Sequence, residues 1–101
     1  MSNVAATTPG SKPGLVFFHS STSGKCRRTE GYISQVLQRR RNHETFKYYA
    51  VAQEKRPDLL EKFGIEFTPT IVVLERKAIA ARLEGPRGSK DIERFLQPWL
   101  K

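Results

Sequence analysis

The sequence is short of cysteine and has no long apolar run. A single cysteine, Cys26, in 101 residues excludes an internal disulfide, and one cysteine with two separated histidines makes a poor zinc site. No stretch approaches the roughly 20 apolar residues of a membrane helix, and residues 1–14 lack the apolar run of a secretion signal. We therefore expect a cytoplasmic protein that binds no membrane and needs no metal or organic cofactor.

Acidic residues are also scarce relative to basic ones. The chain has 18 Lys and Arg against 10 Asp and Glu, a formal net charge of +8. Such an excess favours nucleic acid, acidic proteins or anionic ligands as partners. The run Arg39-Arg40-Arg41 could grip phosphate, but the other basic residues are scattered and interspersed with Glu. Nucleic-acid binding is therefore the least favoured of the functions that we consider.

Length and composition limit the chain to one folded unit. With 38% apolar residues it can build one core but not two. Residues 1–14 are small, polar and rich in turn formers, so we predict a flexible N-terminal arm there. Residues 15–101 then form the folded domain.

The apolar pattern predicts seven elements in the order βαβαββα. Short apolar runs mark the strands, and helical periodicity with capping residues marks the helices. The predicted strands are 15–18, 46–51, 70–74 and 78–84; the predicted helices run from a Ser23 cap to about Arg41, from Pro57 to Phe63, and from a Ser89 cap towards Pro98. The last two strands form a hairpin that turns at Arg76-Lys77. A strand, a helix and a second strand imply a parallel pair, to which the hairpin adds antiparallel strands. We predict an α/β fold with a mixed four-stranded sheet flanked by helices.

Three local motifs lie within this order of elements. They are Leu15–His19 followed by Ser23-Gly24-Lys25-Cys26, Phe63-Gly64-Ile65 followed by Thr68-Pro69-Thr70, and Ala80–Gly85 followed by Phe95-Leu96. Together they resemble the thioredoxin family over residues 15–100. The corresponding family segments are the strand leading into Cys-Gly-Pro-Cys, the segment that carries a cis-proline, and the last strand, glycine and helix. The resemblance implies a thioredoxin-like fold.

The sequence lacks some of the residues that dithiol chemistry requires. A dithiol oxidoreductase needs an attacking thiolate and a second thiol three residues on. Ser23 stands at the attacking position, and only Cys26 survives. By the resemblance, Phe17 replaces the family's buried acid, Thr22 the tryptophan before the motif, and Lys25 the motif proline. We therefore predict that the protein is not a dithiol disulfide reductase.

The sequence supports two interpretations of Cys26. In the first turn of a helix, beside Lys25, Arg27 and Arg28, the thiolate would be stabilised. Helical spacing also places the cysteine on the same face as Ile33, where the sulfur would point inward and lose its hydration. Cys26 is thus either a working monothiol, forming a mixed disulfide with a protein or a low-molecular-weight thiol, or a buried remnant.

The resemblance supplies the other candidate site residues. Ser23, Gly24 and Lys25 would form a groove with Thr68 and Pro69, in which the backbone of Thr68 pairs with an extended peptide. Our leading hypothesis is an atypical single-cysteine thioredoxin-like protein that acts as a monothiol. The alternative is a redox-inactive module that binds a protein or peptide in this groove.

Neither histidine is predicted to be catalytic. His19 ends the first strand near Cys26 and could pair with it, but a structural role is favoured. His43 follows the basic run at a helix end, where cations complement the carbonyl dipoles. We interpret His43 as a solvated capping residue.

Overall fold

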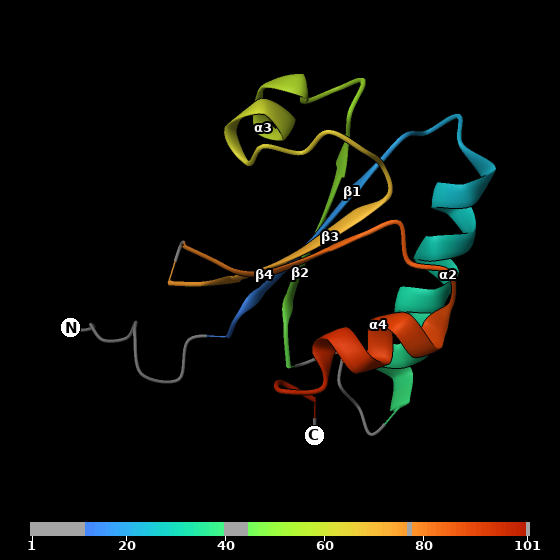
Figure 1. Ribbon diagram of the computed structural model, residues 1–101, viewed down its shortest axis with the longest axis vertical. Coiled ribbons are helices and arrows are strands. Elements are labelled where there is room, and N and C mark those ends of the chain that lie inside the picture. The colour runs from blue at the N-terminus through green and yellow to red at the C-terminus, as the bar shows by residue number, and fades with distance from the viewer. Residues whose placement is uncertain (1–11, 40–44, 77, 101) are drawn as a thin grey trace.

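Seven elements follow one another in the predicted order (Figure 1). The computed structural model describes residues 12–39, 45–76 and 78–100. The strands are β1 (Gly14–His19), β2 (Lys47–Ala52), β3 (Thr70–Glu75) and β4 (Ala78–Glu84), and the helices are α2 (Gly24–Gln38), α3 (Pro57–Lys62) and α4 (Ser89–Leu96). The predicted α/β fold class and element order are confirmed.

The four strands form one mixed sheet in the order β2-β1-β3-β4. β1 pairs with β2 in parallel and with β3 antiparallel, so that Phe17 stands opposite Ala50 on one side and Ile71 on the other. β3 and β4 form the predicted antiparallel hairpin, which turns through Arg76 at a φ of 53°. Lys77, the other predicted turn residue, lies outside the described residues. The sheet agrees with the prediction from sequence.

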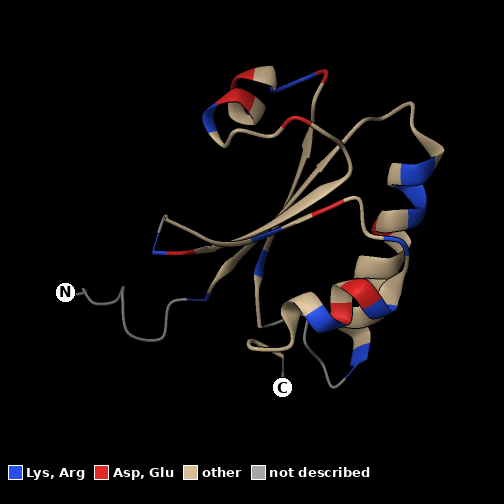
Figure 2. Cartoon of the chain, in the orientation of Figure 1, with Lys and Arg blue, Asp and Glu red and all other residues tan. Residues whose placement is uncertain are grey.

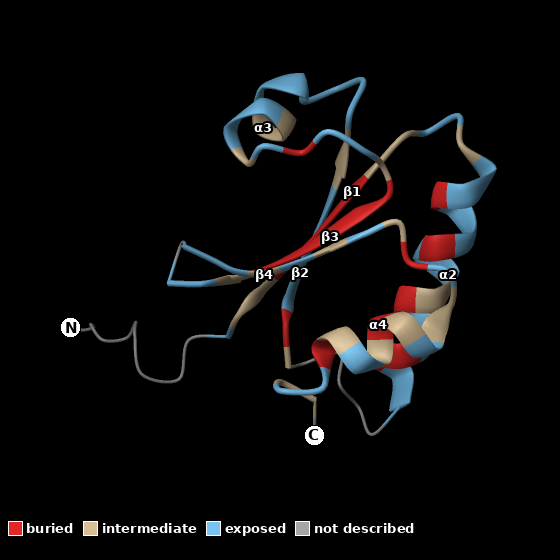
Figure 3. Ribbon diagram, in the orientation of Figure 1, coloured by how far each residue is buried: buried red, intermediate tan, exposed pale blue. Residues whose placement is uncertain are grey.

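Two apolar layers cover the two faces of the sheet. The central strands β1 and β3 are buried on both faces (Figure 3), which is why they are continuous apolar runs. α2 and α4 lie on one side of the sheet and α3 on the other (Figure 1). The strand side chains under α2 and α4 are Leu15, Phe17, Ile71 and Val73, and those packed with α3 are Val16, Phe18 and Val72.

α2 carries the first site motif and packs on the sheet through one face. Its N-cap is Ser23, whose hydroxyl accepts a hydrogen bond from the Cys26 amide at 3.2 Å, as the sequence predicts. The buried face of the helix comprises Cys26, Thr29, Ile33, Val36 and Leu37. The cap therefore fixes where the helix begins, and the apolar face fixes its rotation over the sheet.

α2 ends earlier than predicted. Its last residue is Gln38, and the C-cap Arg39 is extended, with its amide hydrogen-bonded to the carbonyl of Val36. The Arg39 guanidinium pairs with Glu93 of α4 at 3.1 Å. The predicted end at about Arg41 was therefore wrong. Residues 40–44, which include His43 and the rest of the basic run, lie outside the described residues.

The start of α4 also differs from the prediction. Gly88 is the N-cap, and Ser89 is the first helical residue, without a capping hydrogen bond from its side chain. The Asp91 carboxylate instead accepts a hydrogen bond from the Arg87 amide at 2.9 Å. The predicted Ser89 cap was therefore wrong by one residue. The helix ends at Leu96, ahead of Pro98.

Part of the predicted N-terminal arm can be placed. Residues 1–11 lie outside the described residues, whereas Gly14 already belongs to β1. The carbonyl of Pro13 accepts a hydrogen bond from the Lys47 amide at 2.9 Å, which extends the β1–β2 pairing by one residue. In the described ranges, no helix is long and apolar enough to cross a membrane.

Candidate functional site

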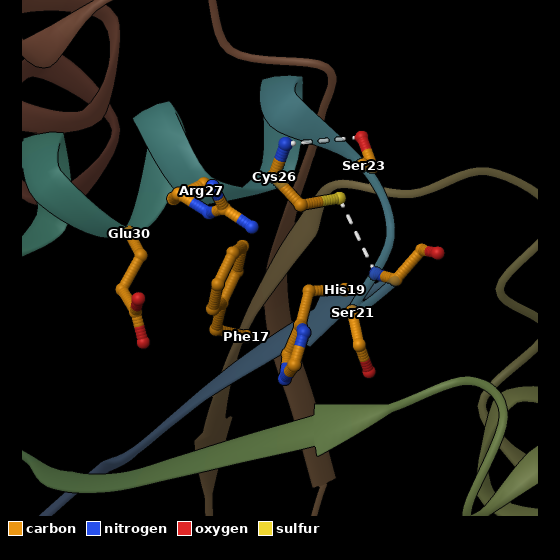
Figure 4. A pocket seen from close by; sticks show the side chains of 8 residues that line it. Phe17, His19, Ser21, Ser23, Cys26, Arg27 and Glu30 are labelled. Carbon is orange, nitrogen blue, oxygen red and sulfur yellow. Dashed lines mark hydrogen bonds between the residues drawn. The ribbon is translucent and has the colours of Figure 1, made fainter.

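The candidate site is built where β1 ends and α2 begins. After His19 the chain turns through Ser20 to Ser23, and the Ser23 amide donates to the Ser20 carbonyl at 3.2 Å. This turn brings the first turn of α2 back over the end of β1. The Ser20 amide then donates a hydrogen bond to the sulfur of Cys26 at 3.3 Å (Figure 4).

The Cys26 side chain points inward. The residue is 2% exposed and belongs to the core cluster formed with Phe17, Ile33 and Ile71. This orientation agrees with the helical spacing noted in the sequence. In these surroundings the sulfur has apolar neighbours and one backbone donor, and it is shielded from solvent.

A pocket of about 150 Å³ opens beside the sulfur (Figure 4). The parallel register places Ala50 opposite Phe17 and Ala52 opposite His19. Pockets for drug-sized ligands are about 300–1,000 Å³, so this one suits only a much smaller molecule. Its lining residues are Phe17, His19, Ser20, Ser21, Ser23, Cys26, Arg27 and Glu30.

His19 lines the pocket but is not hydrogen-bonded to the cysteine. Its ring stacks on Phe17, with centroids 5.1 Å apart and an interplanar angle of 21°. In the part of the chain that the structure describes, the hydrogen bond to the Cys26 sulfur comes from the Ser20 amide. This arrangement fits the structural role favoured for His19.

Glu54 is a polar residue near the site that sequence reasoning missed. Its carboxylate accepts a hydrogen bond from the Ser21 amide at 2.8 Å. Hydrogen bonding from Ser21 holds the pKa of Glu54 below its ordinary value, and the charge of His19 makes a smaller contribution. Glu54 follows β2 as Ser21 follows β1, and the carboxyl ends of parallel strands meet at one edge of a sheet. The predicted parallel pairing of the first two strands could therefore have indicated that Glu54 lies near the site.

Thr68 and Pro69 lie at the same end of the sheet. Their peptide bond is cis, and β3 starts directly afterwards with Thr70 opposite Phe18. The carbonyl of Pro69 accepts a hydrogen bond from Gly85 at 2.9 Å. The hydroxyl of Thr68 donates to the side-chain oxygen of Gln53 at 3.3 Å.

The small pocket includes only some of the predicted site residues. The pocket takes Ser23 and Cys26 from the first motif, whereas Gly24 and Lys25 are exposed at the start of α2. Thr68 is half-buried beside Gln53 and is not part of the lining. The structure therefore shows a small pocket beside the Cys26 sulfur, and Thr68 is not among the residues that line this pocket.

Comparison with known proteins identifies the family of the chain. The sequence model of the family described as Thioredoxin matches residues 3–98. The chain belongs to the thioredoxin family. No curated protein sequence matches the chain. Within the family, its single cysteine marks an atypical active site.

Solved structures of thioredoxins have the same fold. Desulfothioredoxin from Desulfovibrio vulgaris Hildenborough, in its reduced form, is 22% identical with a TM-score of 0.74, covering 88% of this chain and 83% of that one. The germline-specific thioredoxin Deadhead of Drosophila melanogaster is 16% identical with a TM-score of 0.77, covering 88% and 82%. Thioredoxin NaTrxh from Nicotiana alata is 18% identical with a TM-score of 0.76, covering 89% and 75%. At these identities the likeness shows the fold alone.

The charges of this thioredoxin-family chain are unevenly spread (Figure 2). Lys25, Arg27 and Arg28 crowd the first turns of α2, which have no acidic residue in the first turn. α3 and α4 carry both signs, and ion pairs such as Arg94 with Asp91 at 3.0 Å form within them. Arg39, the described member of the basic run, is paired with Glu93. Three of the described cations are thus grouped at the N-terminal end of α2.

Proposed function

We propose that this thioredoxin-family chain is a redox-inactive protein-binding module. The burial of Cys26 carries the proposal, since the residue is 2% exposed. Thiol–disulfide exchange needs a thiolate that a substrate disulfide can reach. Ser23, at the outer position of the motif, offers a hydroxyl that serves as a helix cap. A hydroxyl without an activating base is a weak nucleophile.

The binding surface that we propose centres on the backbone of Thr68. Among the described residues, neither its amide nor its carbonyl has a hydrogen-bond partner, whereas the neighbouring Pro69 carbonyl is bonded to Gly85. Unpaired backbone groups at the end of a strand can pair with an extended segment of another protein. Such a surface needs no thiol chemistry.

The reactivity of Cys26 tests this proposal first. The alkylation rate of the folded chain is measured against pH, with the urea-unfolded chain as the reference and Cys26→Ser as the blank. We expect modification of the folded chain to be far slower than that of the unfolded chain, because Cys26 is only 2% exposed. Alkylation of the folded chain as fast as that of the unfolded chain would contradict a redox-inactive module.

A monothiol role is the second candidate, and one contact favours it. The Ser20 amide donates to the Cys26 sulfur at 3.3 Å, so a backbone donor already contacts the atom that would react. In this reaction the Cys26 thiolate attacks a disulfide, forms a mixed disulfide and releases one thiolate. An external thiolate then attacks the mixed disulfide and regenerates Cys26, because the chain has no second cysteine.

Mass spectrometry distinguishes the two candidates. The folded chain is incubated with oxidised glutathione, and the intact mass is then recorded. A monothiol gains one glutathione moiety, which reduced glutathione removes. The binding module gains none while folded, and its binding is the same with Cys26→Ser.

A further inference from the structure

A shallow groove of about 530 Å³ lies along the outer side of α2, which is exposed to solvent (Figure 3). It shares no lining residue with the pocket at Cys26, and neither Thr68 nor Pro69 belongs to it. The residues that line this α2 groove are Arg28, Gly31, Tyr32, Ser34, Gln35 and Gln38. The surface is therefore separate from the one that the proposed function uses.

Gly31 opens the helix backbone to this groove. A Cβ atom at its position would have no neighbouring atom within 4 Å, so packing within the described residues does not require a glycine there. Glycine in the interior of a helix also lowers its stability relative to alanine. The missing side chain instead allows a second chain to approach the backbone of α2 closely.

The charge along this side of α2 is positive. Arg28 lines the groove, and Lys25 lies three residues earlier, which places both on neighbouring positions of the helix surface (Figure 2). Neither cation belongs to an ion pair among the described residues. Glu30, the acidic residue of α2, lines the pocket at Cys26 instead. The α2 groove therefore complements a negatively charged partner.

The shape of the α2 groove suits a helix. From Arg28 to Gln38 the axis of α2 rises by about 15 Å, close to three helical turns. Tyr32 is half-buried against the core and still lines the groove, so it presents a fixed apolar surface beside Gly31. Two helices pack by laying the side chains of one into the gaps between side chains of the other. Gly31 provides such a gap.

We propose that the α2 groove is a docking surface for an acidic helical segment of a partner protein. A large apolar side chain of the segment packs over Gly31 and against Tyr32. Its carboxylates pair with Arg28 and Lys25. This interaction goes beyond the proposed function and does not depend on the backbone of Thr68.

Selection from a library of random peptides displayed on phage tests the proposal. The full chain is immobilised, and the enriched peptides are synthesised for binding measurements. We expect a class of peptides that is rich in Asp and Glu, carries a large apolar residue and becomes helical on binding, as followed by circular dichroism. Amide chemical shifts of the chain should change in residues 25–38 and not in residues 67–70.

Substitutions at Gly31 separate binding from stability. Gly31→Ala should raise the urea midpoint of unfolding, because a methyl group is accommodated and favours the helix. Gly31→Trp fills the groove and should weaken binding of the acidic peptides about tenfold or more. Arg28→Glu should have a similar effect on binding. Lys62→Glu makes the same change of charge on α3, across the sheet, and should leave binding within about twofold.

Three outcomes overturn the proposal. If acidic peptides bind Gly31→Trp as well as the wild-type chain, they dock elsewhere, and the α2 groove is not their site. If the chain selects only peptides that shift residues 67–70, the proposed function stands and the α2 groove has no partner. If no acidic peptide is selected, but a single-stranded DNA oligonucleotide binds and loses affinity with Arg28→Glu, the partner class is wrong.

Discussion

The amide of Ser20 donates a hydrogen bond to the sulfur of Cys26 across 3.3 Å, joining the end of β1 to the first turn of α2. The contact holds the only thiol of the chain against the core. A single side chain thus has two possible uses, one in packing and one in chemistry. The packing of the Cys26 side chain in the core leads to a prediction for the stability of the fold.

Replacing Cys26 with Ala should destabilise the fold without affecting binding. The sulfur fills part of the core and accepts one hydrogen bond, so its loss should lower the free energy of unfolding by about 1–2 kcal/mol. Urea unfolding followed by circular dichroism measures this change. Ser34→Ala on the exposed face of α2 is the control and should stay within about 0.5 kcal/mol. An unchanged stability of Cys26→Ala would show that the sulfur does not contribute to the core.

Ser23 should behave as a helix cap. Ser23→Ala removes the acceptor of the Cys26 amide and should lower the free energy of unfolding by about 1 kcal/mol. Ser23→Asp keeps an acceptor and adds a negative charge at the positive end of the helix dipole, so it should retain the stability. Thermal unfolding of the two variants provides the comparison. Equal losses of stability in Ser23→Ala and Ser23→Asp would argue against a capping role for Ser23.

Arg82 should stabilise the loop that carries Phe67 and Thr68. Arg82→Met keeps the aliphatic stem but removes the donors to the carbonyls of Phe63 and Gly64. We expect the free energy of unfolding to fall by about 1 kcal/mol, with faster amide hydrogen exchange in residues 63–70. The matched control is Arg28→Met, since Arg28 has no ion pair among the described residues. Unaltered exchange in the loop of Arg82→Met would refute this role.

Strong local signals allowed most of the fold to be predicted from the sequence. β1 and β3 could be identified because a strand buried on both faces must be continuously apolar. The inward direction of Cys26 followed from helical spacing with Ile33, and the Ser23 cap from its position before the apolar face. These features depend on a few adjacent residues.

Features that depend on tertiary register could not be predicted in the same way. The pairing of Ala50 with Phe17 and of Ala52 with His19 depends on the register of the parallel strands β1 and β2. The presence of an alanine in a strand does not indicate which residue of the neighbouring strand lies opposite it. The cap of α4 was misassigned by one residue because Gly88 and Ser89 are adjacent and both residue types are common at helix N-caps.

The last prediction concerns Tyr48, which faces α2 from β2. Burial of the phenol raises the pKa of Tyr48 from its ordinary value of 10.0 to about 12, and the charge of Glu30 adds to the rise, although the residue as a whole is 40% exposed. The neutral phenol is therefore favoured by folding. Its contribution to stability is complete below pH 10 and is lost as the pH rises through about 12.

Spectrophotometric titration of tyrosinate measures this effect. In the wild-type chain we expect one of the three tyrosines to ionise at about pH 12, and Tyr48→Phe should remove that ionisation. Glu30→Gln should lower the pKa of Tyr48 only in part, because desolvation is the larger cause and remains in place. If Tyr48→Phe leaves the high-pH ionisation intact, the phenol is not shielded by α2. That result would assign the high-pH ionisation to another tyrosine.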